Sequence, residues 1–258
     1  MSTSPTNMAA RRSSTRPSVL MCLPNRDFDP TEAAVTWKVL HTAGIGVEFA
    51  TPDGQPARGD RDTLRGGFRG PFPARPEAVS AYRAMLEDPR YARPLTWSDA
   101  ASRHPDAVVF PGGHAAGVRP YLESPAVQEI ALAAHRRGAT IGAICHGVLV
   151  LARTTDPQTG RSLLDGRTVT SLTKSLERSA FALTFWRVGR RFRTYPVYTE
   201  DEVRQSLGPT GRFVVGGVRS EPHVVQDGNL VTARYAVDVR RFGQMLAAKL
   251  AVAAERTA

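Results

Sequence analysis

Hydrophobic residues occur along the chain in two alternating patterns. Short continuous apolar runs of strand length lie at 18–23, 46–50, 106–110 and 139–144. Apolar residues at helical spacing fill the stretches at 30–43, 76–87, 125–137 and 237–252. A run at 167–171 and a glycine-turned hairpin at 223–233 add later strands. Buried strands alternating with amphipathic helices predict an α/β protein, a three-layer α/β/α sandwich around a mostly parallel sheet.

The stretch 139–150 carries the strongest chemical signal. Its apolar run ends at Cys145, His146 and Gly147, and apolar residues then resume at helical spacing. A strand, a tight turn and a helix form a nucleophile elbow, which lifts a side chain out of the carboxyl edge of the sheet. The helix N-terminus favours a thiolate at Cys145, and glycine at 147 lets strand and helix approach closely. The alternative is a small buried core cysteine.

A helix-start signal precedes Glu32. Asp29 followed by Pro30 is a helix cap with proline at the first helical position. Glu32 therefore lies in the first helical turn, at the carboxyl edge of the first strand. Cys145 must emerge at that same edge of a parallel sheet, so we expect the two side chains to lie close together. Alternatively, Glu32 only complements the helix dipole.

The strand at 106–110 runs into a turn that contains Gly112, Gly113 and His114. Adjacent glycines leave backbone N–H groups accessible, so this turn could supply an oxyanion hole together with the amide of His146. His114 could face the pocket, or be a capping or surface histidine.

Composition narrows the class of protein. A chain of 258 residues with 41% hydrophobic content can bury a sizeable core. Its two cysteines, Cys22 and Cys145, form no disulfide framework, so we expect a reducing, cytoplasmic location. No apolar stretch has membrane-spanning length. Residues 1–17 are expected to form a disordered tail without a secretory signal, with an organelle transit peptide as the alternative.

The net charge of +10 invites a nucleic-acid interpretation. The arginines are scattered, however, and dense only within 11–16 and 187–193, which is typical of solvated faces. No recognition helix, zinc finger or aromatic RNA-binding pattern accompanies them. We therefore expect no specific nucleic-acid partner.

The domain organisation is predicted from where the regular spacing of hydrophobic residues stops. Residues 18–254 are expected to form a single domain. Within it, 55–100 begins with a Gly-, Pro- and Arg-rich stretch and is expected to be a lid-like insertion, with 76–97 packing as a flap or small subdomain.

Four segments together resemble a known family: the elbow at 143–147, the strand and turn at 108–114, Glu32, and the hairpin at 227–232. They look like the ThiJ/PfpI superfamily, over about residues 18 to 252. The resemblance implies a class I glutamine-amidotransferase-like, flavodoxin-like fold. The passage 155–177 is similar to the heat-shock-chaperone branch, whose members act as glutathione-independent glyoxalases.

The resemblance also implies site roles. Cys145 would be the nucleophile and His146 its acid/base partner. Glu177 would orient that histidine, and Glu32 would hydrogen-bond to the sulfur with a pKa raised by the neighbouring thiolate. Fallbacks for Glu177 are Glu200, Asp201 and Glu202. No cofactor or metal is implied; the expected partners are a small-molecule aldehyde and, as a family property, a second copy of the chain.

The expected function is conversion of 2-oxoaldehydes such as methylglyoxal to 2-hydroxy acids such as D-lactate, and deglycation could use the same site. Two other classes stay open. One is a holding chaperone or redox-sensing stress protein. The other is a different cysteine-elbow hydrolase or hydratase, for example an amidase or isonitrile hydratase.

Overall fold

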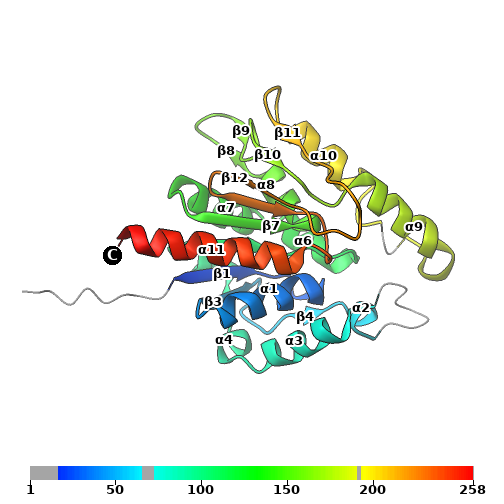
Figure 1. Cartoon of the computed structure of the whole chain (residues 1–258), viewed down its shortest axis with the longest axis horizontal. Coiled ribbons are helices and arrows are strands. Elements are labelled where there is room, and N and C mark those ends of the chain that lie inside the picture. Colours follow the sequence, from blue (N-terminus) through cyan, green and yellow to red (C-terminus); the bar gives the residue numbers. More distant parts are fainter. Residues whose placement is uncertain (1–16, 66–72, 191–192, 258) are drawn as a thin grey trace, which may run out of the picture.

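A seven-stranded sheet forms the centre of the molecule (Figure 1). The computed structural model describes residues 17–65, 73–190 and 193–257. In sheet order the strands are β12 (Val224–Asp227), β13 (Leu230–Ala233), β7 (Thr140–Ile144), β6 (Ala107–Phe110), β1 (Ser18–Cys22), β3 (Gly46–Thr51) and β5 (Leu95–Thr96). Every neighbouring pair is parallel except the hairpin β12–β13. The predicted mostly parallel sheet is confirmed.

Helices cover both faces of this sheet and complete the three layers. On one face lie α1 (Pro30–Thr42), α3 (Pro76–Leu86) and α11 (Val239–Thr257). On the other lie α5 (Trp97–Ala101), α7 (Pro125–Arg136) and α8 (Val148–Arg153). Each layer has its own apolar cluster, because the strands are buried on both sides. The flavodoxin-like α/β/α sandwich is therefore confirmed.

The predicted flap at 76–97 is wrong. Helix α3 packs against α1 and buries Tyr82 and Met85 in the core, and β5 pairs with β3 as an edge strand of the main sheet. The indole of Trp37 on α1 donates to Asp88 at 3.2 Å, which anchors the same segment. Residues 76–100 therefore belong to the central layers. The insertion begins with β4 (Arg58–Gly59), paired with β2 (Arg26–Phe28), and α2 (Arg61–Arg65).

The remaining elements are short or lie outside the two helical layers named above. They are α4 (Pro89–Ala92), η1 (Ala116–Val118), α6 (Arg119–Leu122), η2 (Cys145–Gly147), β8 (Thr155–Asp156), β9 (Arg161–Ser162), β10 (Thr168–Val169), α9 (Lys174–Val188), α10 (Thr199–Ser206) and β11 (Arg212–Phe213). The strand predicted at 167–171 is β10, which pairs with β11 outside the main sheet. No helix within the described ranges is long and apolar enough to span a bilayer. The expected tail and its arginines at 11–16 lie outside the described residues.

Candidate active site

The elbow has the predicted form. Strand β7 ends at Ile144, η2 makes the turn, and α8 follows directly. Cys145 has a φ of 58°, a left-handed conformation that costs a non-glycine residue free energy and is concentrated at functional sites. A Cβ at Gly147 would lie 2.0 Å from the carbonyl oxygen of Phe110 on β6, so glycine is required there by close packing. The strained turn favours a functional cysteine over a plain core residue.

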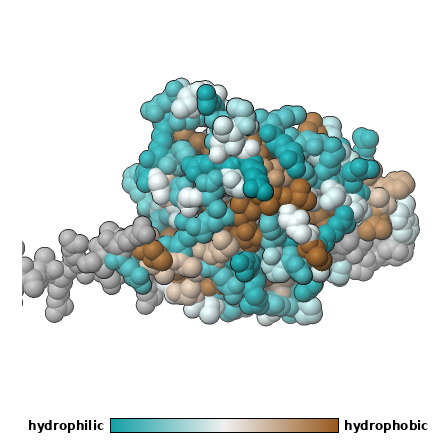
Figure 2. Space-filling view, turned by 45° about the horizontal axis from the view of Figure 1, so that its top comes forward, coloured by the Kyte–Doolittle hydropathy of each residue, from teal (hydrophilic) through white to brown (hydrophobic). Residues whose placement is uncertain are grey.

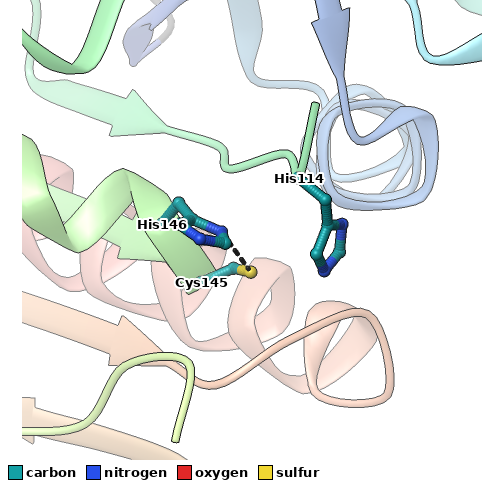
Figure 3. Close-up of side chains that lie close together, drawn as sticks. All are labelled: His114, Cys145 and His146. Atoms are coloured by element: carbon teal, nitrogen blue, oxygen red, sulfur yellow. Dashed lines mark hydrogen bonds between the residues drawn. The ribbon is translucent and has the colours of Figure 1, made fainter. Parts of the chain in front are cut away.

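Three chemically active side chains converge at this turn (Figure 3). The Sγ of Cys145 lies 3.6 Å from Nδ1 of His146. The ring of His114 stands edge-on to that of His146, with 5.5 Å between centroids. Cys145 and His146 are fully buried, whereas His114 is partly exposed. Of the interpretations left open for His114, the geometry favours a position at the pocket, and His114 is the partly exposed member of the group.

Glu32 reaches the same place from α1. The side chain of Asp29 accepts from the backbone N–H groups of Thr31 and Glu32, at 2.8 and 3.1 Å, so the predicted cap forms. The carboxyl group of Glu32 is buried, and its Oε2 accepts from the N–H of Gly112 at 2.8 Å. It also interacts with the side chain of Cys145, and this interaction affects the pKa of both groups, in line with the predicted contact to the sulfur. A residue that only complemented the helix dipole would face solvent, so the structure favours the functional interpretation of Glu32.

Burial sets the protonation of these groups. It raises the pKa of Glu32 well above the ordinary value, with the charge of Asp29 as the next cause. It likewise raises the pKa of the Cys145 thiol, and negative charge on Glu32 adds to this, while the backbone N–H of His146 opposes it. Burial lowers the pKa of His146, helped by the charges of His114 and Arg153.

The resting site therefore holds a thiol, a neutral imidazole and a protonated carboxyl group. The expectation that the helix N-terminus favours a thiolate is not met for this state, because burial raises the pKa of the Cys145 thiol. The raised pKa of Glu32 agrees in direction with the expectation, although burial rather than a thiolate charge is its main cause. A neutral imidazole beside a thiol is placed to take the thiol proton as the sulfur attacks.

The predicted oxyanion hole needs correction. The N–H of Gly112 already donates to Glu32, so it is not free for an oxyanion in the resting state. The part of the His146 amide in an oxyanion hole stays a prediction. A Cβ at Gly112 would lie within 3 Å of His146, Cys145 and Glu32 atoms, so this glycine instead lets the groups approach each other. The role of Gly113 stays a prediction.

Glu177 does not orient His146 as expected. Glu177 lies in the first turn of α9, not at the strand edge where it was expected. Its Oε2 accepts from the backbone N–H of Thr199 at 3.1 Å. Nε2 of His146 has no hydrogen-bond partner among the described residues. The fallbacks are engaged elsewhere: Glu200 with Lys174 and Arg204, Asp201 with Lys174, and Glu202 with Arg153.

The same cluster has the donor set of a soft-metal site. Donor atoms of His114, Cys145 and His146 lie within 4.8 Å of one another, and thiolate with imidazole suits Zn²⁺. Binding a cation here would occupy the nucleophile. The expectation that the site needs no metal or cofactor remains a prediction.

A cavity of about 610 Å³ opens beside His114, and its lining includes Arg119, Arg190 and Arg193. The sequence predicts a solvated face for the run at 187–193; Arg190 is exposed and Arg193 is half-buried, and both line this cavity. The side chain of Arg187 and the whole of Arg191 lie outside the described residues. The high density of arginine was visible in the sequence. The spacing of hydrophobic residues, however, could not show that these arginines lie near the elbow.

Replacing Glu32 with glutamine is expected to remove a pH-dependent loss of stability. The pKa of Glu32 is higher in the folded protein than in the unfolded chain. Such a group contributes its full stabilisation at a pH below its pKa in the unfolded chain. That stabilisation is lost as the pH rises through its pKa in the folded protein. Glutamine stays neutral and keeps an oxygen for the N–H of Gly112. From pH 4 to 8, the Tm of the wild type should therefore fall relative to that of Glu32→Gln. Asp29 is present in both proteins, so its titration largely cancels in the difference between their Tm values.

The matched control is Glu48→Gln, at an exposed position of β3, which also removes one negative charge. Thermal unfolding followed by circular dichroism measures all three proteins. A Tm difference between Glu32→Gln and the wild type that stays constant over this range would contradict the raised pKa.

Comparison with known proteins agrees with this geometry. A family model described as "ThiJ/PfpI family-like" matches residues 23–214. The glutathione-independent glyoxalase HSP31 of Saccharomyces cerevisiae is 28% identical over 112 residues, which span 43% of this chain and 44% of that protein. The crystal structure of glyoxalase III from Candida albicans is 18% identical with a TM-score of 0.69, covering 90% of this chain and 96% of that chain.

The Rapid Encystment Protein of Francisella tularensis is also 18% identical, with a TM-score of 0.68 over 91% of this chain and 99% of that chain. At these identities the solved structures support the fold alone. The region matched by the family model contains Glu32, the elbow and the arginine-lined cavity. The chain belongs to the ThiJ/PfpI family.

Proposed function

We propose that this protein is a cysteine-dependent, cofactor-free glyoxalase that converts 2-oxoaldehydes such as methylglyoxal to 2-hydroxy acids. One observation carries the proposal: the sulfur of Cys145 lies at a strained elbow, 3.6 Å from Nδ1 of a neutral His146, beside the buried carboxyl group of Glu32. The glyoxalase activity named for the Saccharomyces cerevisiae relative supports the same reaction class.

The reaction starts when Nδ1 of His146 takes the thiol proton and the sulfur attacks the aldehyde carbon, C1. The imidazolium protonates the C1 oxygen, which gives a hemithioacetal. Neutral His146 then removes the C1 proton while the Glu32 O–H protonates the C2 oxygen, which gives an enediol. Return of the proton from His146 to C2, with loss of the C1 hydroxyl proton to Glu32, leaves a thioester.

Water hydrolyses the thioester to the 2-hydroxy acid and the free thiol. C1 is oxidised and C2 is reduced within one molecule, so no external oxidant or reductant is needed. Each group returns to its starting protonation state. This cycle uses the resting state described above, in which Glu32 is the acid and His146 is the base.

The test is incubation of purified protein with methylglyoxal in the absence of glutathione and in the presence of a metal chelator. Loss of the aldehyde should be matched by formation of lactate, measured by chiral chromatography. Bovine serum albumin at equal thiol concentration controls for adduct formation without turnover. Aldehyde loss that stops at one equivalent per protein, with no lactate, would contradict the proposal.

A second candidate function is a holding chaperone. Leu183, Phe185 and Trp186 on α9 expose 63%, 54% and 62% of their surface. Figure 1 places α9 at one end of the molecule. The hydropathy view in Figure 2 shows apolar surface at that end. Exposed apolar patches of this kind mark surfaces for protein contact. Such an activity would need α9 and not the sulfur of Cys145.

A further inference from the structure

The cavity beside His114 has an unusual charge. Its lining comprises His114, Ala116, Arg119, Phe181, Arg190, Arg193, Thr194, Tyr195 and Pro196. Three of these residues are arginines and none is acidic. Other arginines in the described part of the chain form ion pairs, for example Arg153 with Glu202 and Arg167 with Asp227. Among the described residues, no carboxylate forms an ion pair with any of the three cavity arginines.

Two of these guanidinium groups are held in place by neutral partners. Arg119 donates from Nε to the carbonyl of Thr194 at 2.7 Å and lies 5.2 Å from the ring centroid of Tyr195. Arg193 donates from Nε to the carbonyl of Tyr195 at 3.0 Å and lies 3.8 Å from the ring centroid of Tyr198. Carbonyls and aromatic rings position both groups. Among the described residues, the one carboxyl group found to interact with Arg193 is the buried Glu177, whose pKa is raised by burial and lowered by the charge of Arg193, without an ion pair between the two.

Each of these two arginines still has N–H groups to donate. A guanidinium carries five N–H donors, and Arg119 and Arg193 each use two of them on backbone carbonyls. Arg190 adds a third, exposed side chain. Planar, positioned guanidinium groups recognise carboxylate and phosphate by paired, charge-assisted hydrogen bonds. The cavity is therefore built for an anionic group.

The position of the cavity links it to the reaction. His114 belongs both to the cavity wall and to the cluster around the Cys145 sulfur, whose donor atoms lie within 4.8 Å of one another. A small molecule that fills this cavity would therefore contact both His114 and the arginines.

We infer that the preferred substrates are 2-oxoaldehydes with an anionic tail, a carboxylate or a phosphate, which Arg119, Arg190 and Arg193 bind while the aldehyde reaches Cys145. This inference rests on the proposed function and names its substrate class. A hydrogen bond to a charged group contributes roughly 1.5–3 kcal/mol, so the anionic tail should raise kcat/KM by on the order of 10- to 100-fold over a neutral one. Added salt should reduce this preference.

The test compares 4,5-dioxopentanoate with its methyl ester, which differ in the charge of the tail and by one methyl group. Each adds one water and gives 2-hydroxyglutarate or its monoester. The wild type should favour the carboxylate by at least about tenfold in kcat/KM. Arg193→Gln and Arg190→Gln should lower kcat/KM for the carboxylate more than for the ester, and Arg193→Lys should recover part of the difference.

The control is Arg161→Gln on the β8–β9 hairpin, whose exposed side chain pairs with Asp165 and lies outside the cavity lining. It should leave the ratio of the two substrates unchanged. The side chain of Arg190 has no hydrogen-bond or ion-pair partner among the described residues, and only its backbone carbonyl accepts, from the N–H of Arg193. Its variant therefore tests the inference even if Arg193→Gln does not fold. The same comparison with 3-phosphonooxy-2-oxopropanal distinguishes a phosphate from a carboxylate tail.

The outcomes separate this inference from the proposed function. Equal kcat/KM for acid and ester in the wild type, unaffected by the arginine variants, would overturn the anion site and leave the glyoxalase function intact. Turnover of no 2-oxoaldehyde would overturn the function. The anion site would then be judged by calorimetric binding of glutarate, an unreactive dicarboxylate. Binding that weakens at least about tenfold in Arg193→Gln and Arg190→Gln supports the site, and no binding to the wild type overturns it.

Discussion

Cys145→Ala is expected to lower kcat for methylglyoxal by at least about 10³-fold, the scale on which removal of a catalytic nucleophile acts. Alanine leaves no atom that can form the hemithioacetal, so the enediol and thioester cannot be made on the protein. His146 and Glu32 remain, but they have no covalently held substrate between which to move a proton. Lactate formation under steady-state conditions measures the effect.

Cys22→Ala is the matched control, because Cys22 is a second fully buried free cysteine. It lies on β1, and burial raises the pKa of its thiol as well. Both variants remove one buried sulfur and create a similar small cavity, at a cost of about 1 kcal/mol in stability. Only Cys145→Ala should lose turnover; full turnover in that variant would reject the proposed mechanism.

The same pair of variants decides the role of the exposed apolar side chains on α9. If the protein also holds unfolded clients, both variants should suppress the aggregation of a heated client protein as well as the wild type does. Replacing Trp186 with a polar residue should weaken that suppression. A holding activity lost in Cys145→Ala and kept in Cys22→Ala would instead tie it to the elbow and favour a redox-sensing role for the cysteine.

Local chemistry is what the sequence predicted well. The cap formed by Asp29 and Pro30 depends on neighbouring residues only, and so does the elbow from Ile144 to Gly147. The topology of a parallel sheet then brings Glu32 and Cys145 to one edge, because strands β1 and β7 point the same way on either side of β6. These two steps were enough to predict that Glu32 and Cys145 lie together at this edge.

The errors share a different cause, since each depends on how distant segments pack. The thiol pKa is raised by burial beneath several elements at once, a sum that no local pattern contains. The carboxyl group of Glu177 reaches the backbone of Thr199 across a loop instead of His146. The flap was mistaken because β5 contributes two residues to the sheet, Leu95 and Thr96, too few to give a strand pattern.

Gly147→Ala is expected to lower the free energy of unfolding by about 3 kcal/mol or more. The added Cβ would lie 2.0 Å from the oxygen of Phe110, and 2.8 Å from the Phe110 carbonyl carbon and the Pro111 oxygen. All three are backbone atoms at the end of a strand held on both sides within the sheet, so they cannot move aside as a side chain could. Urea unfolding followed by tryptophan fluorescence measures the change.

Two other glycines separate this clash from the general effects of adding a methyl group. Gly217→Ala meets no atom within 4 Å and should change stability by no more than about 0.5 kcal/mol. Gly138→Ala also meets open space but has a φ of +69°, so it should cost roughly 1–2 kcal/mol through backbone conformation alone. Unfolding of Gly147→Ala at the same urea concentration as Gly217→Ala would contradict the prediction. It would mean that β6 and α8 can move apart at little cost in free energy. The contact matters beyond stability, because the strand end that Gly147 touches leads directly to Gly112, whose N–H holds Glu32 beside the sulfur.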